Sequence, residues 1–196
     1  MKIAIVKYNA GNIQSVIYAL NRLGIEPVLT DNHEELRAAD KVVFPGVGEA
    51  SSAMNYLKEA NLDTFLPTLV QPFFGICIGQ QLMCQHSEEG DVDCLGIFPL
   101  KVKKFDTTTG LKVPHMGWNN LSNCQSPLFK DITEKEDYIY YVHSYYCELG
   151  QETIATTDYV LPYSAALQKD NFYAVQFHPE KSGKVGETVL KNFLEM

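Results

Sequence analysis

The residues most able to do chemistry are a cysteine between two glycines and a histidine followed closely by a glutamate. Residues 75–79 read Gly-Ile-Cys-Ile-Gly and follow the apolar pair Phe73-Phe74. A strand that turns sharply into a helix leaves its turn residue in a strained conformation, and flanking glycines avoid collisions there. This pattern predicts an exposed Cys77 thiol above a helix N-terminus, where the helix dipole and free N–H groups favour thiolate. We therefore expect Cys77 to be a nucleophile; the alternative is a small buried cysteine.

The tripeptide His178-Pro179-Glu180 supplies the base that such a nucleophile needs. In extended backbone, residues i and i+2 point to the same side, so the Glu180 carboxylate can lie beside the His178 imidazole. A carboxylate on one ring nitrogen fixes the tautomer and leaves the other nitrogen for the nucleophile. We therefore predict a Cys-His-Glu triad. Taken alone, the tripeptide also allows a surface histidine beside a solvated glutamate, or a zinc site of His178, His143 and Cys77.

The composition is that of an ordinary globular protein and narrows its partners. The chain has 196 residues, 45% of them hydrophobic and 20% charged, which suits one α/β domain with a real core. Its net charge of −8 argues against nucleic acid or an anionic membrane as a partner. The chain shows neither a secretory leader core nor a membrane-spanning run, and its five cysteines include no Cys-x-x-Cys pair. We expect a cytoplasmic protein with reduced thiols, no metal and no cofactor.

The first half of the chain alternates short apolar strands with helices. Strands are expected over residues 3–6, 27–30 and 41–44, with a fourth that ends at Cys77. This alternation predicts an open, mostly parallel sheet with helices on both faces, whose ligands bind beyond the carboxyl ends of the strands. Beyond about residue 95, strand-like runs predict hairpins that extend the sheet with antiparallel strands, before a last helix. Because no linker interrupts the pattern, residues 1–196 are expected to form one domain.

Several stretches resemble a known family. Two closely resemble the class I glutamine amidotransferases; they are residues 75–81 and 176–180. Three more resemble one branch, the glutaminase subunit of imidazole glycerol phosphate synthase; they are residues 45–48, 114–119 and 141–145. The resemblance runs from Met1 to Met196 and implies a flavodoxin-like fold, a glutamine amidotransferase type 1 domain, over the whole chain. The chain departs from the family pattern in the first loop, residues 7–12, and at Ile78 and Gln80, where Leu and Met are common.

The resemblance implies an enzyme that hydrolyses L-glutamine to glutamate and ammonia. Cys77 would form a γ-glutamyl thioester, with His178 as acid and base and Glu180 orienting it. The oxyanion would be held by the backbone N–H group of Ile78 and by that of Val47 or Gly48 in the glycine-rich loop, residues 45–48. The amino-acid end of glutamine would be bound at Gly48, Gln81, Ser144 and Tyr145.

The resemblance also implies a partner protein. The family pairs this subunit in a heterodimer with a (β/α)8 cyclase, which receives the ammonia through a channel. That cyclase forms imidazole glycerol phosphate and an aminoimidazole carboxamide ribotide (AICAR) in histidine biosynthesis. Asn12, in the first loop, and Trp118, expected in a glycine-flanked turn, are candidate interface residues, because exposed tryptophan favours interfaces. A packing role for Trp118 is the alternative.

Three other functions fit part of this pattern. The chain could be a glutaminase that feeds another synthase, such as one for pyridoxal phosphate, purine or anthranilate. It could be a stand-alone cysteine hydrolase, such as a peptidase or a γ-glutamyl hydrolase, which would turn over without a partner. It could also be a non-catalytic regulatory module that only binds a synthase, which a detectable thioester would exclude.

Overall fold

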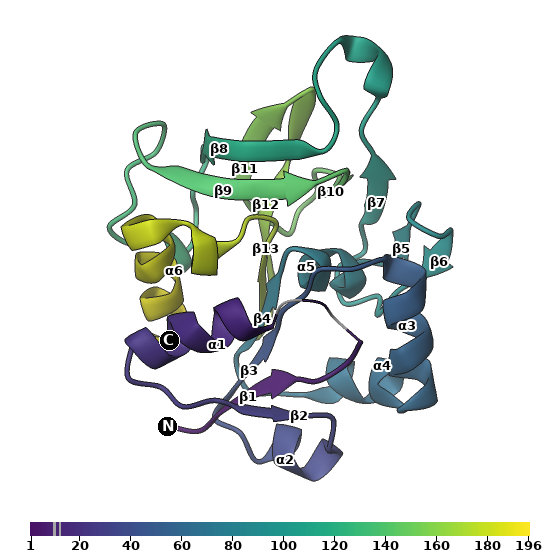
Figure 1. Ribbon diagram of the computed structural model, residues 1–196, viewed down its shortest axis with the longest axis vertical. Helices are drawn as coiled ribbons and strands as arrows, with labels where there is room; N and C mark the ends of the chain where they lie inside the picture. The colour runs from purple at the N-terminus through teal and green to yellow at the C-terminus, as the bar shows by residue number, and fades with distance from the viewer. Residues whose placement is uncertain (10, 12) are drawn as a thin grey trace.

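The main sheet has seven strands and is mostly parallel. Figure 1 shows the computed structural model, which describes residues 1–9, 11 and 13–196. The strand order is β11-β12-β13-β4-β3-β1-β2. The strands β13, β4, β3, β1 and β2 are parallel to one another. The strand β12 pairs antiparallel with β13, and β11 pairs antiparallel with β12. Their bounds are β1 Ile3–Val6, β2 Val28–Thr30, β3 Lys41–Phe44, β4 Phe73–Ile76, β11 Thr153–Tyr159, β12 Leu161–Lys169 and β13 Phe172–Val175. The predicted fold class is confirmed.

Helices cover both faces of this sheet (Figure 1). The α-helices are α1 Gln14–Arg22, α2 His33–Arg37, α3 Ala50–Glu59, α4 Leu62–Phe65, α5 Ile78–Met83 and α6 Gly183–Glu195. The 3₁₀ turns are η1 Leu66–Thr68, η2 Thr107–Thr109, η3 Pro127–Phe129 and η4 Pro179–Lys181. Side chains alternate along a strand, so Ile3 and Ile5 pack with α1 and α6, while Ala4 and Val6 pack with the helices of the other face. The nucleophile turn is thereby fixed between two cores.

The other strands form two smaller sheets. One has the order β10-β7-β5-β6, and the other pairs β8 with β9. Their bounds are β5 His86–Ser87, β6 Val92–Asp93, β7 Lys101–Lys104, β8 His115–Asn120, β9 Tyr138–His143 and β10 Tyr145–Cys147. The expectation that all the later strands extend the main sheet is therefore wrong for these. A bend at Ser144 divides the predicted strand, so β9 pairs with β8 and β10 pairs with β7.

Trp118 lies within β8 and not in a turn, which corrects the expectation from its flanking glycine. Gly117 has φ +137° but stays in the ladder, paired with Tyr141. Asn32 caps the N-terminus of α2, because its side chain accepts hydrogen bonds from the N–H groups of Glu34 and Glu35.

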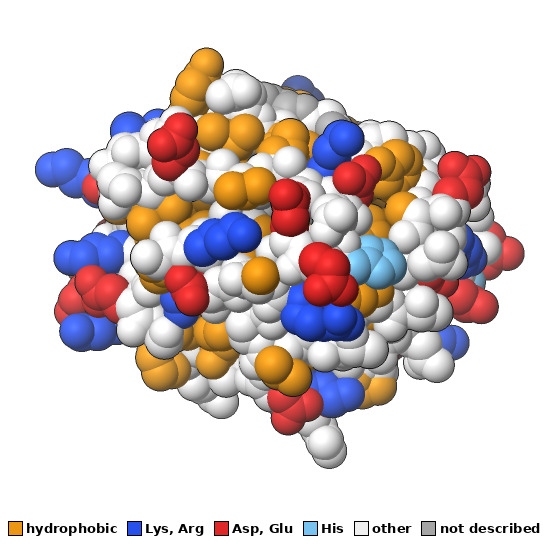
Figure 2. All heavy atoms as spheres, turned by 90° about the horizontal axis from the view of Figure 1, so that it is seen from below, with side chains coloured by type: hydrophobic (Ala, Val, Ile, Leu, Met, Phe, Trp, Pro, Cys, Tyr) orange, Lys and Arg blue, Asp and Glu red, His pale blue; other side chains and the backbone are white. Residues whose placement is uncertain are grey.

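The face of the molecule seen in Figure 2 carries charges of both signs. Figure 2 shows one face on which acidic and basic side chains are interspersed among hydrophobic ones, so this face presents no block of one sign. Among the described residues, no helix is long and apolar enough to cross a membrane.

Candidate active site

Cys77 occupies a strained turn between β4 and α5. Its φ and ψ are 54° and −109°, outside the range that residues with a side chain usually adopt. The flanking glycines allow close packing, because a Cβ at Gly79 would overlap the carbonyl oxygen of Phe44 and one at Gly75 would meet Met83 Sδ. The Cys77 N–H donates to the carbonyl of Val175 in β13 at 2.8 Å. The predicted turn is present, but the residue is only 6% exposed rather than freely exposed.

His178 and Glu180 form a buried pair. The His178 Nδ1 to Glu180 Oε1 distance is 2.7 Å, and the two side chains are 2% and 4% exposed. Because a carboxylate oxygen accepts, Nδ1 carries the proton and Nε2 is left for another partner. Glu180 lies in the 3₁₀ turn η4 and not in an extended strand, since β13 ends at Val175. The side chains meet as predicted, although the extended i, i+2 argument does not describe this backbone.

The electrostatics of His178 are set by two acidic neighbours. Burial disfavours its charged form, but interactions with Cys77 and Glu180 outweigh burial and raise the pKa of His178 from its ordinary 6.5 to about 10. Nε2 has no hydrogen-bond partner within the described part of the chain. A negative charge on Cys77 raises the pKa of His178, while no hydrogen bond joins His178 Nε2 to Cys77 in this geometry.

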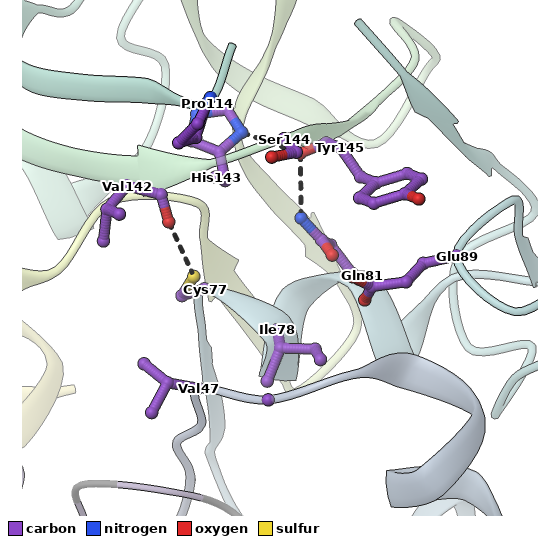
Figure 3. A pocket seen from close by; sticks show the side chains of 11 residues that line it. Val47, Cys77, Ile78, Gln81, Glu89, Pro114, Val142, His143, Ser144 and Tyr145 are labelled. Carbon is purple, nitrogen blue, oxygen red and sulfur yellow. Dashed lines mark hydrogen bonds between the residues drawn. The ribbon is translucent and has the colours of Figure 1, made fainter.

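Cys77 lines a cavity of about 290 Å³. Figure 3 shows Cys77, Gln81, Tyr145 and Ile78 around this space. The complete lining is Val47, Gly48, Cys77, Ile78, Gln81, Glu89, Pro114, Val142, His143, Ser144 and Tyr145. Every residue predicted for the oxyanion and for glutamine binding thus lies on one cavity, while the buried His178 and Glu180 do not line it.

Comparison with known proteins agrees with this geometry. A family model described as "Glutamine amidotransferase class-I" matches residues 4–196. Relatives named imidazole glycerol phosphate synthase subunit HisH are 59% identical in Bacteroides fragilis strain YCH46 and 60% identical in Bacteroides thetaiotaomicron, with 100% of each chain covered. The chain belongs to the class I glutamine amidotransferases, in the HisH group. The resemblance seen in the sequence is confirmed.

Solved structures show the same fold at greater sequence distance. A glutamine amidotransferase superposes with a TM-score of 0.76 at 19% identity, covering 98% of this chain and 97% of that one. A glutamine amidotransferase from Thermotoga maritima gives 0.67 at 13% identity, covering 100% and 83%. At these identities the likeness concerns the fold alone.

The glycine-rich loop of this amidotransferase is tied to neighbouring elements. The Gly11 N–H donates to the Val47 carbonyl at 2.8 Å, and the Tyr8 hydroxyl donates to the Pro45 carbonyl at 2.6 Å. In a trans peptide, the N–H that follows a carbonyl points the opposite way, so the Gly48 N–H points away from Gly11. These two hydrogen bonds and the antiparallel bridge between Gly11 and Val47 tie the loop to the segment that follows β1.

Four cavity residues were not among the predicted site residues: Glu89, Pro114, Val142 and His143. Three of them lie within or at the start of the stretches that resemble the family, so the motif itself was the available signal. Glu89 has no such signal, because it reaches the cavity from the turn between β5 and β6. Burial raises the pKa of Glu89, as does nearby Glu49, although its carboxylate also accepts from the Ala50 N–H at 3.0 Å. It adds an acidic group to the cavity.

His143 is oriented by neutral partners. Its Nδ1 donates to the Tyr145 carbonyl at 2.7 Å, and its Nε2 lies 3.2 Å from the Tyr163 hydroxyl. Both nitrogens are thus engaged, which disfavours the zinc site of His178, His143 and Cys77. Within residues 1–9, 11 and 13–196, no group of three or more His, Cys, Asp or Glu side chains is placed to hold a metal ion.

The two interface candidates are Asn12 and Trp118. Asn12 lies outside the described residues. Trp118 is 57% exposed on β8 and packs edge-on against Tyr140. Met116, on the same strand, and Tyr138, on β9, are also largely exposed. The β8–β9 hairpin therefore presents a group of exposed apolar side chains around Trp118.

Proposed function

We propose that this protein is the glutaminase subunit of an imidazole glycerol phosphate synthase. It hydrolyses L-glutamine through a thioester on Cys77 and passes ammonia to a cyclase subunit for histidine biosynthesis. The observation that carries this proposal is the Cys77 turn on a small cavity, backed by the buried His178–Glu180 pair. Full-length identity of about three residues in five to HisH subunits supports it.

The reaction begins when the Cys77 thiol gives its proton to His178 Nε2. The thiolate attacks the side-chain amide carbon of glutamine, and the resulting oxyanion accepts hydrogen bonds from backbone N–H groups. Ile78 supplies one of these, because the first N–H groups of a helix have no intrahelical acceptor. Val47 or Gly48 supplies the other. Losing one such donor typically costs about 3 kcal/mol of transition-state stabilisation, so the conformation of this loop controls the rate.

His178 then returns its proton to the leaving nitrogen, and ammonia departs as the C–N bond breaks. A water deprotonated by His178 attacks the thioester, the C–S bond breaks, and glutamate is released. Glu180 keeps the Nδ1 proton in place throughout, so that Nε2 faces the reacting atoms. The raised pKa of His178 means that the imidazolium is stable beside the thiolate once the proton has moved.

The cavity suits one amino acid rather than a peptide. Its volume of about 290 Å³ is at the small end for binding sites. The Glu89 carboxylate would accept hydrogen bonds from the α-ammonium group, and Gln81 and Tyr145 lie across the cavity from the glycine-rich loop (Figure 3). Gly48 and Ser144 would bind the remaining polar atoms of the amino-acid end. A single free glutamine is therefore the proposed ligand.

The ammonia is consumed by a cyclase subunit, for which we propose a (β/α)8 barrel and a heterodimer with this chain in the cytoplasm. The exposed Met116, Trp118 and Tyr138 form the proposed docking area. Large aromatic side chains are the residues that most often dominate binding energy at interfaces. The role of Asn12 in docking stays a prediction.

The test uses a diazoketone analogue of glutamine and measures covalent labelling. We expect labelling of wild-type protein and of Cys124→Ala, a matched control that does not line the cavity, but none of Cys77→Ala. Glutamate release should rise sharply when a cyclase subunit and its nucleotide substrate are added. Labelling that survives Cys77→Ala would remove the assigned nucleophile, and equal glutamate release with and without the cyclase would favour a stand-alone hydrolase.

A further inference from the structure

Gln176 is a buried amide beside the nucleophile, and the mechanism above does not use it. It follows β13, is completely buried, and its Nε2 lies 3.7 Å from Cys77 Sγ. It is also two residues before His178, so the two side chains reach the nucleophile from the same short segment. Sulfur accepts hydrogen bonds at longer distances than oxygen does, and it accepts more strongly as a thiolate.

The orientation of the Gln176 amide follows from its partners. The Tyr145 carbonyl only accepts, so the group of Gln81 that lies 2.9 Å from it is the nitrogen Nε2. The same nitrogen lies 2.9 Å from the side chain of Gln176, which must therefore present its oxygen to Gln81. Its own nitrogen then faces the sulfur. Amide orientation is assigned from such networks, and here a carbonyl that cannot donate fixes its direction.

We propose that Gln176 is a catalytic hydrogen-bond donor to the Cys77 thiolate, with Gln81 as the positioning residue that orients it. This inference rests on the proposed role of Cys77 as the nucleophile. When the thiol proton moves to His178, the sulfur keeps the electron pair and the charge. Because Cys77 is only 6% exposed, little water can solvate that charge, and the Gln176 N–H takes the place of a water molecule.

The same donor acts again in the second half of the reaction. When the thioester is hydrolysed, the C–S bond breaks and its electron pair stays on sulfur, so charge develops at the atom that Gln176 faces. Gln176 thus stabilises the leaving thiolate as well as the attacking one. Gln81 links this donor to the Tyr145 carbonyl, whose residue lines the glutamine cavity.

Gln80 provides the matched control. It is the neighbour of Gln81, is completely buried, and donates from Nε2 to the Ser164 carbonyl at 3.0 Å, away from the sulfur. A buried amide with only a structural role lowers stability when it is replaced. A donor to the thiolate also changes how readily the sulfur ionises. Replacing each glutamine with methionine, which is similar in size, separates the two effects.

The experiment measures iodoacetamide alkylation of Cys77 against pH in the full chain, read by mass spectrometry of the peptide that contains Cys77. We expect Gln176→Met to reduce alkylation near neutral pH about tenfold, which moves the midpoint up by about one pH unit. Gln80→Met should leave the midpoint unchanged. An unchanged midpoint in folded Gln176→Met would overturn the proposal.

Gln81→Met is the second variant, for the case in which Gln176→Met does not fold. It removes the donor that orients Gln176, so the midpoint of Cys77 alkylation should move in the same direction by a smaller amount. An unchanged midpoint in Gln81→Met would also overturn the proposal. Labelling of wild-type Cys77 by the glutamine analogue separates the two inferences. Labelling with unchanged midpoints contradicts only the role of Gln176, whereas its absence contradicts the nucleophile itself.

Discussion

The active site contains two buried histidines that differ in charge. His178, after β13, is 1% exposed, and His143, at the end of β9, is 6% exposed. The pKa of His178 is raised to about 10, whereas burial lowers that of His143 to about 3, with smaller effects from the charges of His115 and His178. The Tyr145 carbonyl partly opposes that shift. Two similarly buried histidines therefore have opposite pKa shifts, and the partners of each ring determine the direction of its shift.

The partners of His178 are acids, and those of His143 are neutral. His143 Nδ1 must donate to the Tyr145 carbonyl, so Nε2 accepts from the Tyr163 hydroxyl. The oxygen of that hydroxyl is also 3.2 Å from His115 Nδ1, which can donate to it. This arrangement satisfies a neutral His143 and offers no anion to a charged one. The surroundings of His178 therefore favour its charged form, while His143 stays neutral and is hydrogen-bonded to the Tyr145 carbonyl.

The largest expected effect comes from removing the acid beside His178. Glu180→Gln keeps an oxygen that can accept from Nδ1 but removes the charge, so the pKa of His178 should fall and glutaminase activity should drop about 10²- to 10⁴-fold. Histidine resonances followed by NMR across pH measure the first change, and glutamate release measures the second. Glu187→Gln, an exposed site on α6, makes the same charge change and should alter neither. A His178 pKa that stays near 10 would show that the carboxylate does not create the difference.

A smaller effect should follow removal of the hydroxyl beside His143. Tyr163→Phe leaves His143 Nε2 and His115 Nδ1 without the oxygen they share, which should lower the free energy of unfolding by about 1–3 kcal/mol. Urea unfolding measures this change. Tyr159→Phe removes an exposed hydroxyl that donates to the Lys112 carbonyl and should cost less. Equal losses would mean that the buried hydroxyl has no special role at His143.

The last prediction concerns how stability changes with pH. His178 binds its proton more tightly in the folded state, so its contribution is present below pH 6.5 and is lost as pH rises toward about 10. His143 binds its proton less tightly in the folded state, so stability falls as pH drops from 6.5 toward about 3.

Urea unfolding at pH values below 6.5 tests the loss of stability that is expected from His143. His143→Gln should flatten the loss of stability below pH 6.5 by up to about 1.4 kcal/mol per pH unit, the value for one proton. If the free energy of unfolding falls equally steeply with decreasing pH in this variant, His143 is not the group that titrates.

The parts of the site that could be predicted from sequence are those that the local chain determines. The Cys77 turn depends on its flanking glycines, and the His178–Glu180 contact joins residues two apart. The donor Gln176 is 99 residues from Cys77, and Tyr163 is 20 residues from His143. Such contacts depend on which strands become neighbours, and no local spacing encodes that. Glu89 went unpredicted for the same reason.

The strands likewise include some that the local sequence predicts and some that it does not. The parallel strands β1 to β4 were predicted almost residue by residue, because each is a short apolar run bounded by turn residues. The strand β13, which is also parallel, was expected among the antiparallel strands of the second half. The strand β8 was taken for a turn because Gly117 precedes Trp118, and a glycine with positive φ inside a ladder looks the same in sequence as one in a loop. The division of the strand at Ser144 was likewise invisible, since the residues on both sides favour strands.

The close contact between Gly79 and the Phe44 carbonyl limits how this site could be engineered. Phe44 ends β3, the strand next to β4, so the space allowed to the nucleophile turn is set by an element far earlier in the chain. A designer who grafted only residues 75–79 into another scaffold would lose the surface against which the turn is pressed. A transplanted unit must therefore include at least the segment from β3 through α5, residues 41–83.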